Sequence, residues 1–438
     1  MNLPVVTSSN TRQAAQAACL VFLLSSCGST TAPRPEPTGP AGPQTSFVLR
    51  EVGTGLPRSG QWRNGFDLAD LDGDGHVDIV HGPPRKGVRG PAVFLGDGHG
   101  TFRRWQELSL PSLPYDYGDA VAADLDGDGR PDLALAMHLR GLVALRNDGQ
   151  GKFSPLGPGL PLGKPGSGFS SRAIEAVDWD GDGRTDLVAA SEGPTRFGGS
   201  VVARSSGALG VFLNLGDRWE RVPHPQPDPG FGDGLAVADV DGDGQPDAVT
   251  SAGGADGRSI LHLNDGAGWR GVEVAELPPR ASVGAVAAGD VDGDGRTDLA
   301  IGYLDPEGGV WHAAVDLLLG RPAGFERREL LREEGRTHVR AVVLADLDGD
   351  RRVEVIALRG DGALLVIPVG TPRPATVVAA PDWRRGCSGY GLRVGDLDHD
   401  GHPEIVASFA GETSVWDLDG GCTSGGGIQV WAVETATR

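Results

Sequence analysis

Seven copies of one acidic nonapeptide run through this chain of 438 residues. The copies are DLDGDGHVD from Asp70, DLDGDGRPD from Asp124, DWDGDGRTD from Asp178, DVDGDGQPD from Asp239, DVDGDGRTD from Asp290, DLDGDRRVE from Asp346 and DLDHDGHPE from Asp396. Their starts lie 54, 54, 61, 51, 56 and 50 residues apart, which is enough chain for one four-stranded sheet in each repeat. The repeat therefore predicts an all-β fold, a closed seven-bladed β-propeller.

The nonapeptide carries the ligands of a hard cation. Carboxylates at positions 1, 3, 5 and 9 and a main-chain carbonyl at position 7 form the oxygen set that calcium prefers. Glycine at position 6, such as Gly75, permits the positive-φ bend that turns the chain around an ion. We therefore expect up to seven Ca²⁺ sites, each between strands one and two of a blade, and no other cofactor. The expected ligands are Asp70, Asp72, Asp74, His76, Asp78, Asp124, Asp126, Asp128, Arg130, Asp132, Asp178, Asp180, Asp182, Arg184, Asp186, Asp239, Asp241, Asp243, Gln245, Asp247, Asp290, Asp292, Asp294, Arg296, Asp298, Asp346, Asp348, Asp350, Arg352, Glu354, Asp396, Asp398, Asp400, His402 and Glu404.

These loops differ from an EF-hand, which places a bidentate Glu at position 12. The residues found at that position are His81, Leu135, Ala189, Thr250, Ile301, Ala357 and Ala407. The alternative to a metal site is a solvated acidic hairpin. One copy would leave that alternative open, whereas seven copies with the same carboxylate spacing favour the metal.

The repeated motif resembles the FG-GAP/VCBS repeat family, which includes the seven-bladed propeller of integrin alpha subunits, and the resemblance covers residues 46–438. It implies the propeller and the calcium, but it says little about a ligand because one fold hosts many functions. Two copies depart from the pattern: Arg351 replaces the glycine at position 6, His399 replaces the glycine at position 4, and Glu354 and Glu404 stand at position 9. The loop at Asp346 is therefore the least secure metal site.

Aromatic residues mark the fourth strand of each repeat. Phe102, Phe153, Trp219, Trp269 and Phe325 lie 20 to 25 residues before the next nonapeptide. Phe47 lies 23 residues before the first nonapeptide, so it heads a fourth strand without a repeat of its own. The last repeat has its third strand at 428–433 and little chain beyond it. We therefore expect the two ends of the domain to complete one blade, which removes an exposed sheet edge.

The N-terminal residues 1–26 predict a lipoprotein signal peptide. Arg12 precedes an apolar stretch over 14–24 that is too short to span a bilayer. This stretch ends in Leu-Ser-Ser-Cys at 24–27, which resembles the bacterial lipobox, and Gly28 in place of Asp implies outer-membrane sorting in Gram-negative families. We expect a lipid on Cys27, a Pro-rich tether over 27–45, and a bacterial outer-membrane lipoprotein that faces the periplasm or the cell surface. The alternative is a fortuitous Cys beside an ordinary cleavage site.

The net charge of −20 follows largely from the acidic loops, because four carboxylates in each of seven loops account for 28 of the 59 acidic residues. Seven calcium ions would bring the net charge to about −6. A nucleic-acid-binding protein needs a concentrated basic face, which the sequence does not indicate.

The acidic loops all lie on one face of the expected ring, so the longer and more variable connections lie on the opposite face, where binding usually resides. Cys387 and Cys422 fall in such connections and are expected to pair as a disulfide in an oxidising envelope, with two free thiols as the alternative. Trp416 is the first candidate for a ligand contact, although each aromatic residue is more readily explained as an anchor that packs a loop. The aromatic residues expected on this face are Trp62, Tyr115, Tyr117, Phe169, Phe197, Phe231, Tyr303, Trp311, Trp383, Tyr390 and Trp416.

No catalytic residue is assigned, because the chain has no HExxH motif, no Gly-x-Ser-x-Gly elbow and no phosphate-binding glycine motif. The sequence predicts a lipid-anchored, calcium-stabilised binding or adhesion module for an unknown protein or carbohydrate. The alternative is a carbohydrate-active propeller, either a lectin or a polysaccharide lyase, and a structural envelope protein is a third reading. A lyase would need a base and charge-neutralising residues gathered on the loop face, which sequence alone does not assemble.

Overall fold

The structure is a computed structural model that describes residues 45–437 apart from 86–89, 164–168, 193–195, 198–199, 202–207, 224–231, 233, 252–258, 267, 275, 371–374, 379–385, 412–421 and 423–424. The chain divides into two units, Met1–Gly42 and Pro43–Arg438. The first unit, with the expected signal peptide and Cys27, lies outside the described residues. Of the helices that the structure describes, none is long and apolar enough to cross a membrane.

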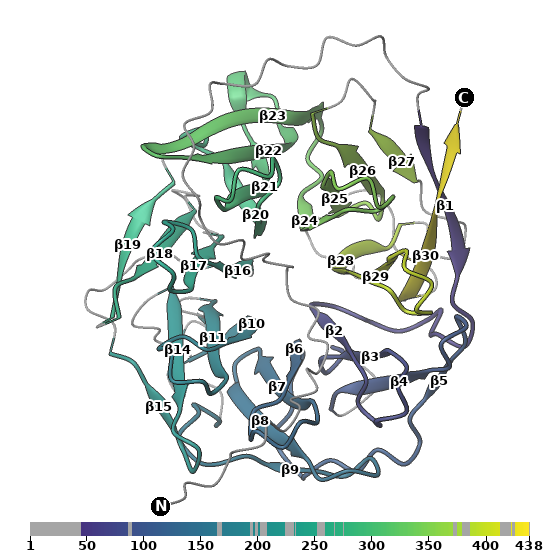
Figure 1. Cartoon of the computed structure of the whole chain (residues 1–438), viewed down its shortest axis with the longest axis vertical. Coiled ribbons are helices and arrows are strands. Elements are labelled where there is room, and N and C mark those ends of the chain that lie inside the picture. Colours follow the sequence, from purple (N-terminus) through teal and green to yellow (C-terminus); the bar gives the residue numbers. More distant parts are fainter. Residues whose placement is uncertain are drawn as a thin grey trace, which may run out of the picture. The chain divides into compact units, whose positions relative to one another are not determined.

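The second unit consists of seven four-stranded antiparallel sheets, the blades of a propeller (Figure 1). Blades one to three are β2(Phe66–Ala69), β3(Asp78–His81), β4(Ala92–Gly96) and β5(Phe102–Arg104); β6(Gly118–Ala123), β7(Asp132–Met137), β8(Gly141–Asn147) and β9(Phe153–Pro155); and β10(Ser171–Val177), β11(Asp186–Ser191), β14(Leu209–Asn214) and β15(Trp219–Arg221). Blades four and five are β16(Leu235–Ala238), β17(Asp247–Thr250), β18(Ile260–Asn264) and β19(Trp269–Glu273); and β20(Ser282–Gly289), β21(Asp298–Asp305), β22(His312–Arg321) and β23(Gly324–Glu334). Blades six and seven are β24(Val339–Ala345), β25(Glu354–Arg359), β26(Leu364–Pro368) and β27(Thr376–Val378); and β28(Ser388–Gly395), β29(Glu404–Ala410), β30(Gly426–Thr437) and β1(Thr45–Val52). A hairpin of β12(Arg196–Phe197) and β13(Ser200–Val201) is inserted in blade three.

Blade seven joins the two ends of the domain, as the sequence predicted. Strand β1 runs antiparallel to β30, with Thr45 opposite Thr437 and Val52 opposite Val430. Phe47 is buried and belongs, with Trp431, to the hydrophobic cluster between blades six and seven. Strand β1 therefore covers the edge of β30, which would otherwise be exposed where the two ends of the domain meet.

The ring closes at its axis through the innermost strands. Each of β2, β6, β10, β16, β20, β24 and β28 contacts the innermost strand of both neighbouring blades. The hydrophobic core lies between neighbouring sheets: one cluster joins Leu142 of blade two to Ile174 and Phe212 of blade three. Small residues such as Ala120 suit the innermost strand because the sheets crowd together near the axis.

The aromatic markers open the outer strands as predicted. Phe102, Phe153, Trp219 and Trp269 begin β5, β9, β15 and β19, and all four are buried. Two of the residues that the sequence placed in loops lie within strands of the blades instead. Tyr303 belongs to β21 and Tyr390 to β28, because these strands have eight residues each and extend into the expected connections. The connection after β21 shortens to residues 306–311 and holds the 3₁₀ helix η1(Glu307–Gly309).

Candidate metal loops and axial cavity

The position-1 carboxylate holds each acidic loop in shape. Asp70 Oδ1 accepts hydrogen bonds from the N–H groups of Gly73 at 2.8 Å and Asp74 at 3.1 Å, and Asp70 Oδ2 accepts one from Gly75 at 2.9 Å. Gly73 and Gly75 have φ angles of 77° and 92°. Both glycine positions therefore use the left-handed region, whereas the sequence argument singled out only position 6. The same bonds recur in the loops that begin at Asp124, Asp239 and Asp290.

The position-9 carboxylate ties the loop to the sheet. Asp78 is fully buried, and its two oxygens accept hydrogen bonds from the N–H groups of Leu71 and Gly96, each at 2.9 Å. Leu71 is the second residue of the loop, and Gly96 ends the third strand of the blade. Two N–H contacts leave lone pairs on the carboxylate for a cation.

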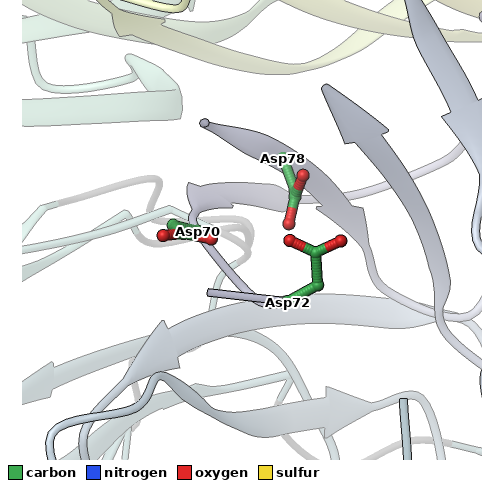
Figure 2. Close-up of side chains that lie close together, drawn as sticks. All are labelled: Asp70, Asp72 and Asp78. Carbon is green, nitrogen blue, oxygen red and sulfur yellow. The ribbon is translucent and has the colours of Figure 1, made fainter. Parts of the chain in front are cut away.

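Three carboxylates converge in each loop for which the cluster is identified. Asp70, Asp72 and Asp78 point toward one another (Figure 2), with one oxygen from each lying within 4.8 Å of the others. The corresponding clusters are Asp124, Asp126 and Asp132; Asp178, Asp180 and Asp186; Asp239, Asp241 and Asp247; and Asp290, Asp292 and Asp294. Positions 1, 3 and 9 thus meet in four loops, and positions 1, 3 and 5 meet in the fifth.

The position-5 carboxylate has a local role as well. Asp74 Oδ1 accepts a hydrogen bond of 2.9 Å from the N–H of His76, the position-7 residue. Equivalent bonds link Arg130 to Asp128, Arg184 to Asp182, Gln245 to Asp243, Arg296 to Asp294, Arg352 to Asp350 and His402 to Asp400. The position-7 carbonyl oxygens stay predicted ligands.

Burial raises the pKa of the position-9 acids, and the neighbouring carboxylates add to the rise. The pKa of Asp78 is raised to about 7, as are those of Glu354 and Glu404, and the pKa values of Asp132, Asp186 and Asp247 are raised to about 6. Without a cation among them, the acids with a pKa of about 7 would be partly protonated at neutral pH, whereas those with a pKa of about 6 would be mostly ionised. The donors are all oxygen and the cluster is crowded with like charge, so the residues fit calcium.

The loop at Asp346 differs from the others. Arg351 adopts a φ of 67°, a conformation that costs a side-chain-bearing residue about 1 to 2 kcal/mol. The N–H of Arg351 still donates to Asp346 Oδ2 at 2.8 Å. The buried Oδ1 atom of Asp346, however, accepts no hydrogen bond from the residues that the structure describes. This loop is strained, yet it leaves a buried oxygen open to a cation. In the last loop His399 takes the position-4 bend with a φ of 59°.

Guanidinium groups lie beside several acidic loops, which the nonapeptide spacing did not reveal. Arg321, at the end of β22, is 3.0 Å from both Asp292 and Asp294. Arg130 and Arg184 form ion pairs with Asp128 and Asp182 in their own loops. These arginines offset part of the negative charge where a cation would bind.

Asparagine side chains link neighbouring acidic loops. Asn147, at the end of β8, donates from Nδ2 to the carbonyl oxygen of Leu71 in blade one at 2.9 Å. Asn214 donates likewise to Leu125 at 2.7 Å, and Asn264 to Trp179 at 2.9 Å. Each of these bonds joins one blade to the acidic loop of the blade before it.

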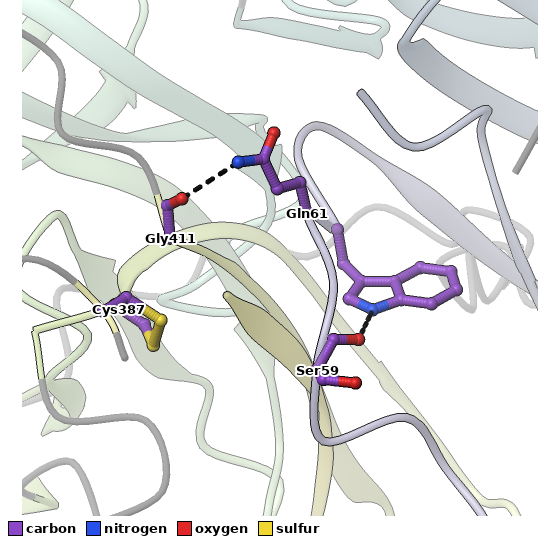
Figure 3. The surroundings of a disulfide bond; sticks show 6 residues. Ser59, Gln61, Cys387 and Gly411 are labelled. Atoms are coloured by element: carbon purple, nitrogen blue, oxygen red, sulfur yellow. Dashed lines mark hydrogen bonds between the residues drawn. A yellow bond between two sulfur atoms is a disulfide. The ribbon is translucent and has the colours of Figure 1, made fainter. Parts of the chain in front are cut away.

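Cys387 and Cys422 form a disulfide in the structure, with their Cα atoms 4.4 Å apart (Figure 3). Beside it, Gln61 of the segment that enters blade one donates from Nε2 to the carbonyl oxygen of Gly411 at 3.0 Å. Trp416, which lies between the two cysteines in sequence, is outside the described residues.

A cavity of about 400 Å³ lies at the ring axis, around the beginnings of the innermost strands. The acidic loops follow the ends of those strands, so the cavity and the acidic loops belong to opposite ends of the axis. The charged and aromatic residues that line the cavity are Arg63, Asp119, Arg172, Glu175, Glu192, His338, Arg340, Tyr390 and Arg393. Sequence reasoning named only Tyr390 among them, because the others come from five blades and form no motif.

The predicted loop aromatics serve different purposes. Trp62 and Phe169 are buried, and Tyr303 is buried with its hydroxyl donating to Asp316 at 2.9 Å. Tyr117 and Tyr390 instead contact arginine side chains at the axis. Tyr115 and Trp311 are partly exposed. The side chains of Phe197, Phe231 and Trp383 lie outside the described residues.

Comparisons with known proteins agree with this architecture. Residues 84–135 match the model of an FG-GAP-like repeat, and residues 282–312 match the model of an FG-GAP repeat. No curated protein sequence matches the chain. Among solved structures, BBS1N in complex with ARL6DN is similar in a mercury-soaked crystal (TM-score 0.53, 14% identity, 88% of this chain and 97% of that one) and in a lead-soaked crystal (0.52, 15%, 88% and 98%). The V. cholerae biofilm matrix protein Bap1 gives a TM-score of 0.43 at 13% identity, over 84% of this chain and 76% of that one.

The two BBS1N structures support the fold alone, because their sequences are so different from this one. The family assignment rests on the two matched segments, each of which contains an acidic nonapeptide, and on the seven blades. This chain is therefore an FG-GAP repeat protein that folds as an integrin-alpha-like seven-bladed β-propeller.

Proposed function

We propose that this protein is a calcium-stabilised binding module, held outside the cytoplasm by a lipid on Cys27, which takes a protein or carbohydrate ligand on the face opposite its acidic loops. One observation carries the proposal: three carboxylates converge in loops that recur in every blade. Such crowding of like charge is costly unless a cation compensates it. A cation there would also stabilise the ring, because the loops are hydrogen-bonded from blade to blade.

The opposite face is the better place for a ligand. The acidic loops are short and nearly identical, so they offer little to distinguish one ligand from another. The other end of the axis has a cavity whose polar residues differ from blade to blade. Such differences allow the site to distinguish one ligand from another. A concave polar site of this size suits a small ligand.

Calcium binding can be tested on the full-length protein by calorimetric titration and by melting with calcium or chelator. A site with a dissociation constant near 0.1 mM contributes about 1.4 kcal/mol of stability in 1 mM calcium, so several sites should raise the melting temperature clearly. Asp72→Asn should remove one ion from the titrated stoichiometry. Asp217→Asn, at an exposed residue of a β14–β15 turn, should leave the stoichiometry unchanged. Melting that ignores calcium in the wild-type protein would refute this part of the proposal.

Lipid anchoring is tested separately. Cys27→Ser should move the protein from the detergent phase to the aqueous phase, because a lipid on Cys27 is the membrane attachment that we propose. Unchanged partitioning of the variant would exclude the anchor without affecting the calcium proposal.

A second function, cleavage of an acidic polysaccharide, is favoured by the presence of arginines, His338 and Tyr390 in one cavity. In this β-elimination an arginine neutralises the uronate carboxylate and a base takes the proton from C5. The C5–H electron pair forms the C4=C5 double bond, and the C4–O bond breaks as its oxygen takes a proton from an acid. Incubation with oligogalacturonate should then yield unsaturated ends that absorb ultraviolet light, and Tyr390→Phe should slow their release. An intact oligosaccharide after long incubation would exclude this function.

A further inference from the structure

We infer that the axial cavity binds a carboxylate-bearing sugar unit, such as a uronic acid, which gives the ligand class of the binding module and rests on that proposed function. The cavity has a volume of about 400 Å³. Small-molecule sites commonly enclose about 300 to 1,000 Å³, so it has room for one such unit of an acidic glycan.

Arg340 supplies the strongest indication of an anion. It lies at the beginning of β24 and lines the cavity. Within the described part of the chain, no carboxylate forms an ion pair with Arg340, and its buried Nε atom has no hydrogen-bond partner. A buried donor without a partner costs free energy, which an anion in the cavity would recover.

Two tyrosine rings hold the arginines in place. The guanidinium carbons of Arg63 and Arg340 lie 5.0 and 5.8 Å from the centre of the Tyr390 ring. Those of Arg63 and Arg172 lie 5.7 and 5.8 Å from the centre of the Tyr117 ring. Contacts of this kind fix planar guanidinium groups before a ligand arrives, which reduces the entropy lost on binding.

Acidic residues neutralise some of these arginines but leave Arg340. Glu192 forms ion pairs with Arg172 and with His138. The pKa of Arg393 is raised by the nearby carboxylates of Glu175, Asp119 and Asp67, although its burial opposes that rise. These acids therefore offset the charges of Arg172 and Arg393, whereas no carboxylate among the described residues forms an ion pair with Arg340.

The cavity also offers an acceptor, which favours a sugar over a simple oxyanion. The buried Oδ1 atom of Asn64 lines the cavity and has no hydrogen-bond partner among the described residues. A fully ionised phosphate carries only acceptors, whereas a uronic acid carries a carboxylate for Arg340 and hydroxyl groups that donate to Asn64. Ser251 and Ser282 add further hydroxyl partners at the cavity wall.

The test measures binding of oligogalacturonate to the full-length protein by calorimetry, with a neutral galactose oligomer of equal length as the reference probe. Arg340→Gln should weaken oligogalacturonate binding about tenfold or more, because it removes charge-assisted hydrogen bonds. Arg103→Gln makes the same charge change at an exposed residue of the outer strand β5 and should leave the affinity unchanged. If Arg340→Gln does not fold, Arg340→Lys keeps the charge, loses the planar fork and should also weaken binding.

Equal affinity for the acidic and neutral oligomers would overturn the inference, as would equal affinities of the Arg340 and Arg103 variants. Competition by inorganic phosphate at the concentration at which galacturonate competes would overturn the sugar assignment. Calcium-dependent melting of the same samples separates the two proposals. If calcium still shifts the melting temperature while oligogalacturonate does not bind, the ligand class fails and the calcium module stands.

Discussion

The side-chain amide of Asn147 donates a hydrogen bond of 2.9 Å to the carbonyl oxygen of Leu71, although 76 residues separate them in sequence. Leu71 is the second residue of the first acidic loop, and its N–H donates to Asp78 of the same loop. The strand-three end of blade two is thereby fastened to the acidic loop of blade one. Leu71 therefore takes part both in the hydrogen bonds that hold the acidic loop in shape and in the bond that links blade one to blade two.

Asn147→Ala should lower the free energy of unfolding by about 1 to 3 kcal/mol, because it leaves the buried carbonyl of Leu71 without this donor. The measurement is denaturant unfolding of the full-length protein. Gln150, exposed in the turn after β8, provides the control, and Gln150→Ala should have a much smaller effect. Equal losses from both variants would show that the link between blades contributes nothing.

Arg351→Gly should stabilise the calcium-loaded protein by about 1 to 2 kcal/mol, because glycine adopts the φ of 67° without the side-chain penalty. Calcium titration should show a tighter site at Asp346. Arg352→Gly makes the same replacement at the next residue, which is not among the positive-φ positions, and should not stabilise the protein. If both variants stabilised the protein, the cause would be the removal of a positive charge and not the relief of backbone strain.

The sequence predicted much of the fold because the information was local and repeated. The nonapeptide spacing gave the number of blades, and Phe47 at its distance from Asp70 gave the closure of blade seven by β1. The bend at position 6 of the loop was also predicted, since glycine there indicates a positive φ, whereas the positive φ at position 4 was not predicted.

The axial cavity could not be predicted in the same way. Arg63, Arg172, Arg340 and Tyr390 come from four blades; Arg63 lies just before β2, and the other three lie near the beginnings of β10, β24 and β28. Their meeting depends on the ring, and nothing in their local sequence distinguishes them from exposed arginines. Arg321 beside Asp292 was missed for a related reason, because its contact depends on the register of β22.

Lowering the pH should stabilise the calcium-free protein but weaken the stabilisation that calcium gives to the loaded protein. Without metal the folded-state pKa of Asp78 is raised from 3.8 to about 7, so the folded state binds a proton that the unfolded state lacks between these values. Lowering the pH from 8 to 6 should therefore raise the melting temperature of the metal-free protein. With calcium present, protons compete with the ion, so the same change should weaken calcium binding. Melting curves at both pH values, with and without calcium, check the signs; parallel shifts would contradict them.

Loss of the disulfide should destabilise blade seven. The bond joins residues 35 apart in sequence, and a loop of that length gives about 2 to 4 kcal/mol by restricting the unfolded chain. Cys387→Ser with Cys422→Ser should lower the melting temperature, and reduction of the wild-type protein should reproduce that shift. A non-reducing peptide map that shows two free thiols in the native protein would remove the basis for this expectation.

Closure of the ring by β1 should stabilise the whole domain. Phe47 is buried in the hydrophobic cluster between blades six and seven that also contains Trp431, so Phe47→Ala should cost about 3 to 5 kcal/mol by opening a cavity there. Val48, its neighbour on β1, is 45% exposed, and Val48→Ala should have little effect. Removal of residues 45–52 should be more damaging than Phe47→Ala, because it also exposes the edge of β30. Unfolding of the truncated protein in a single transition at lower denaturant is the expected result. If the truncated protein unfolded at the same denaturant concentration as the wild-type protein, the ring would not need this strand.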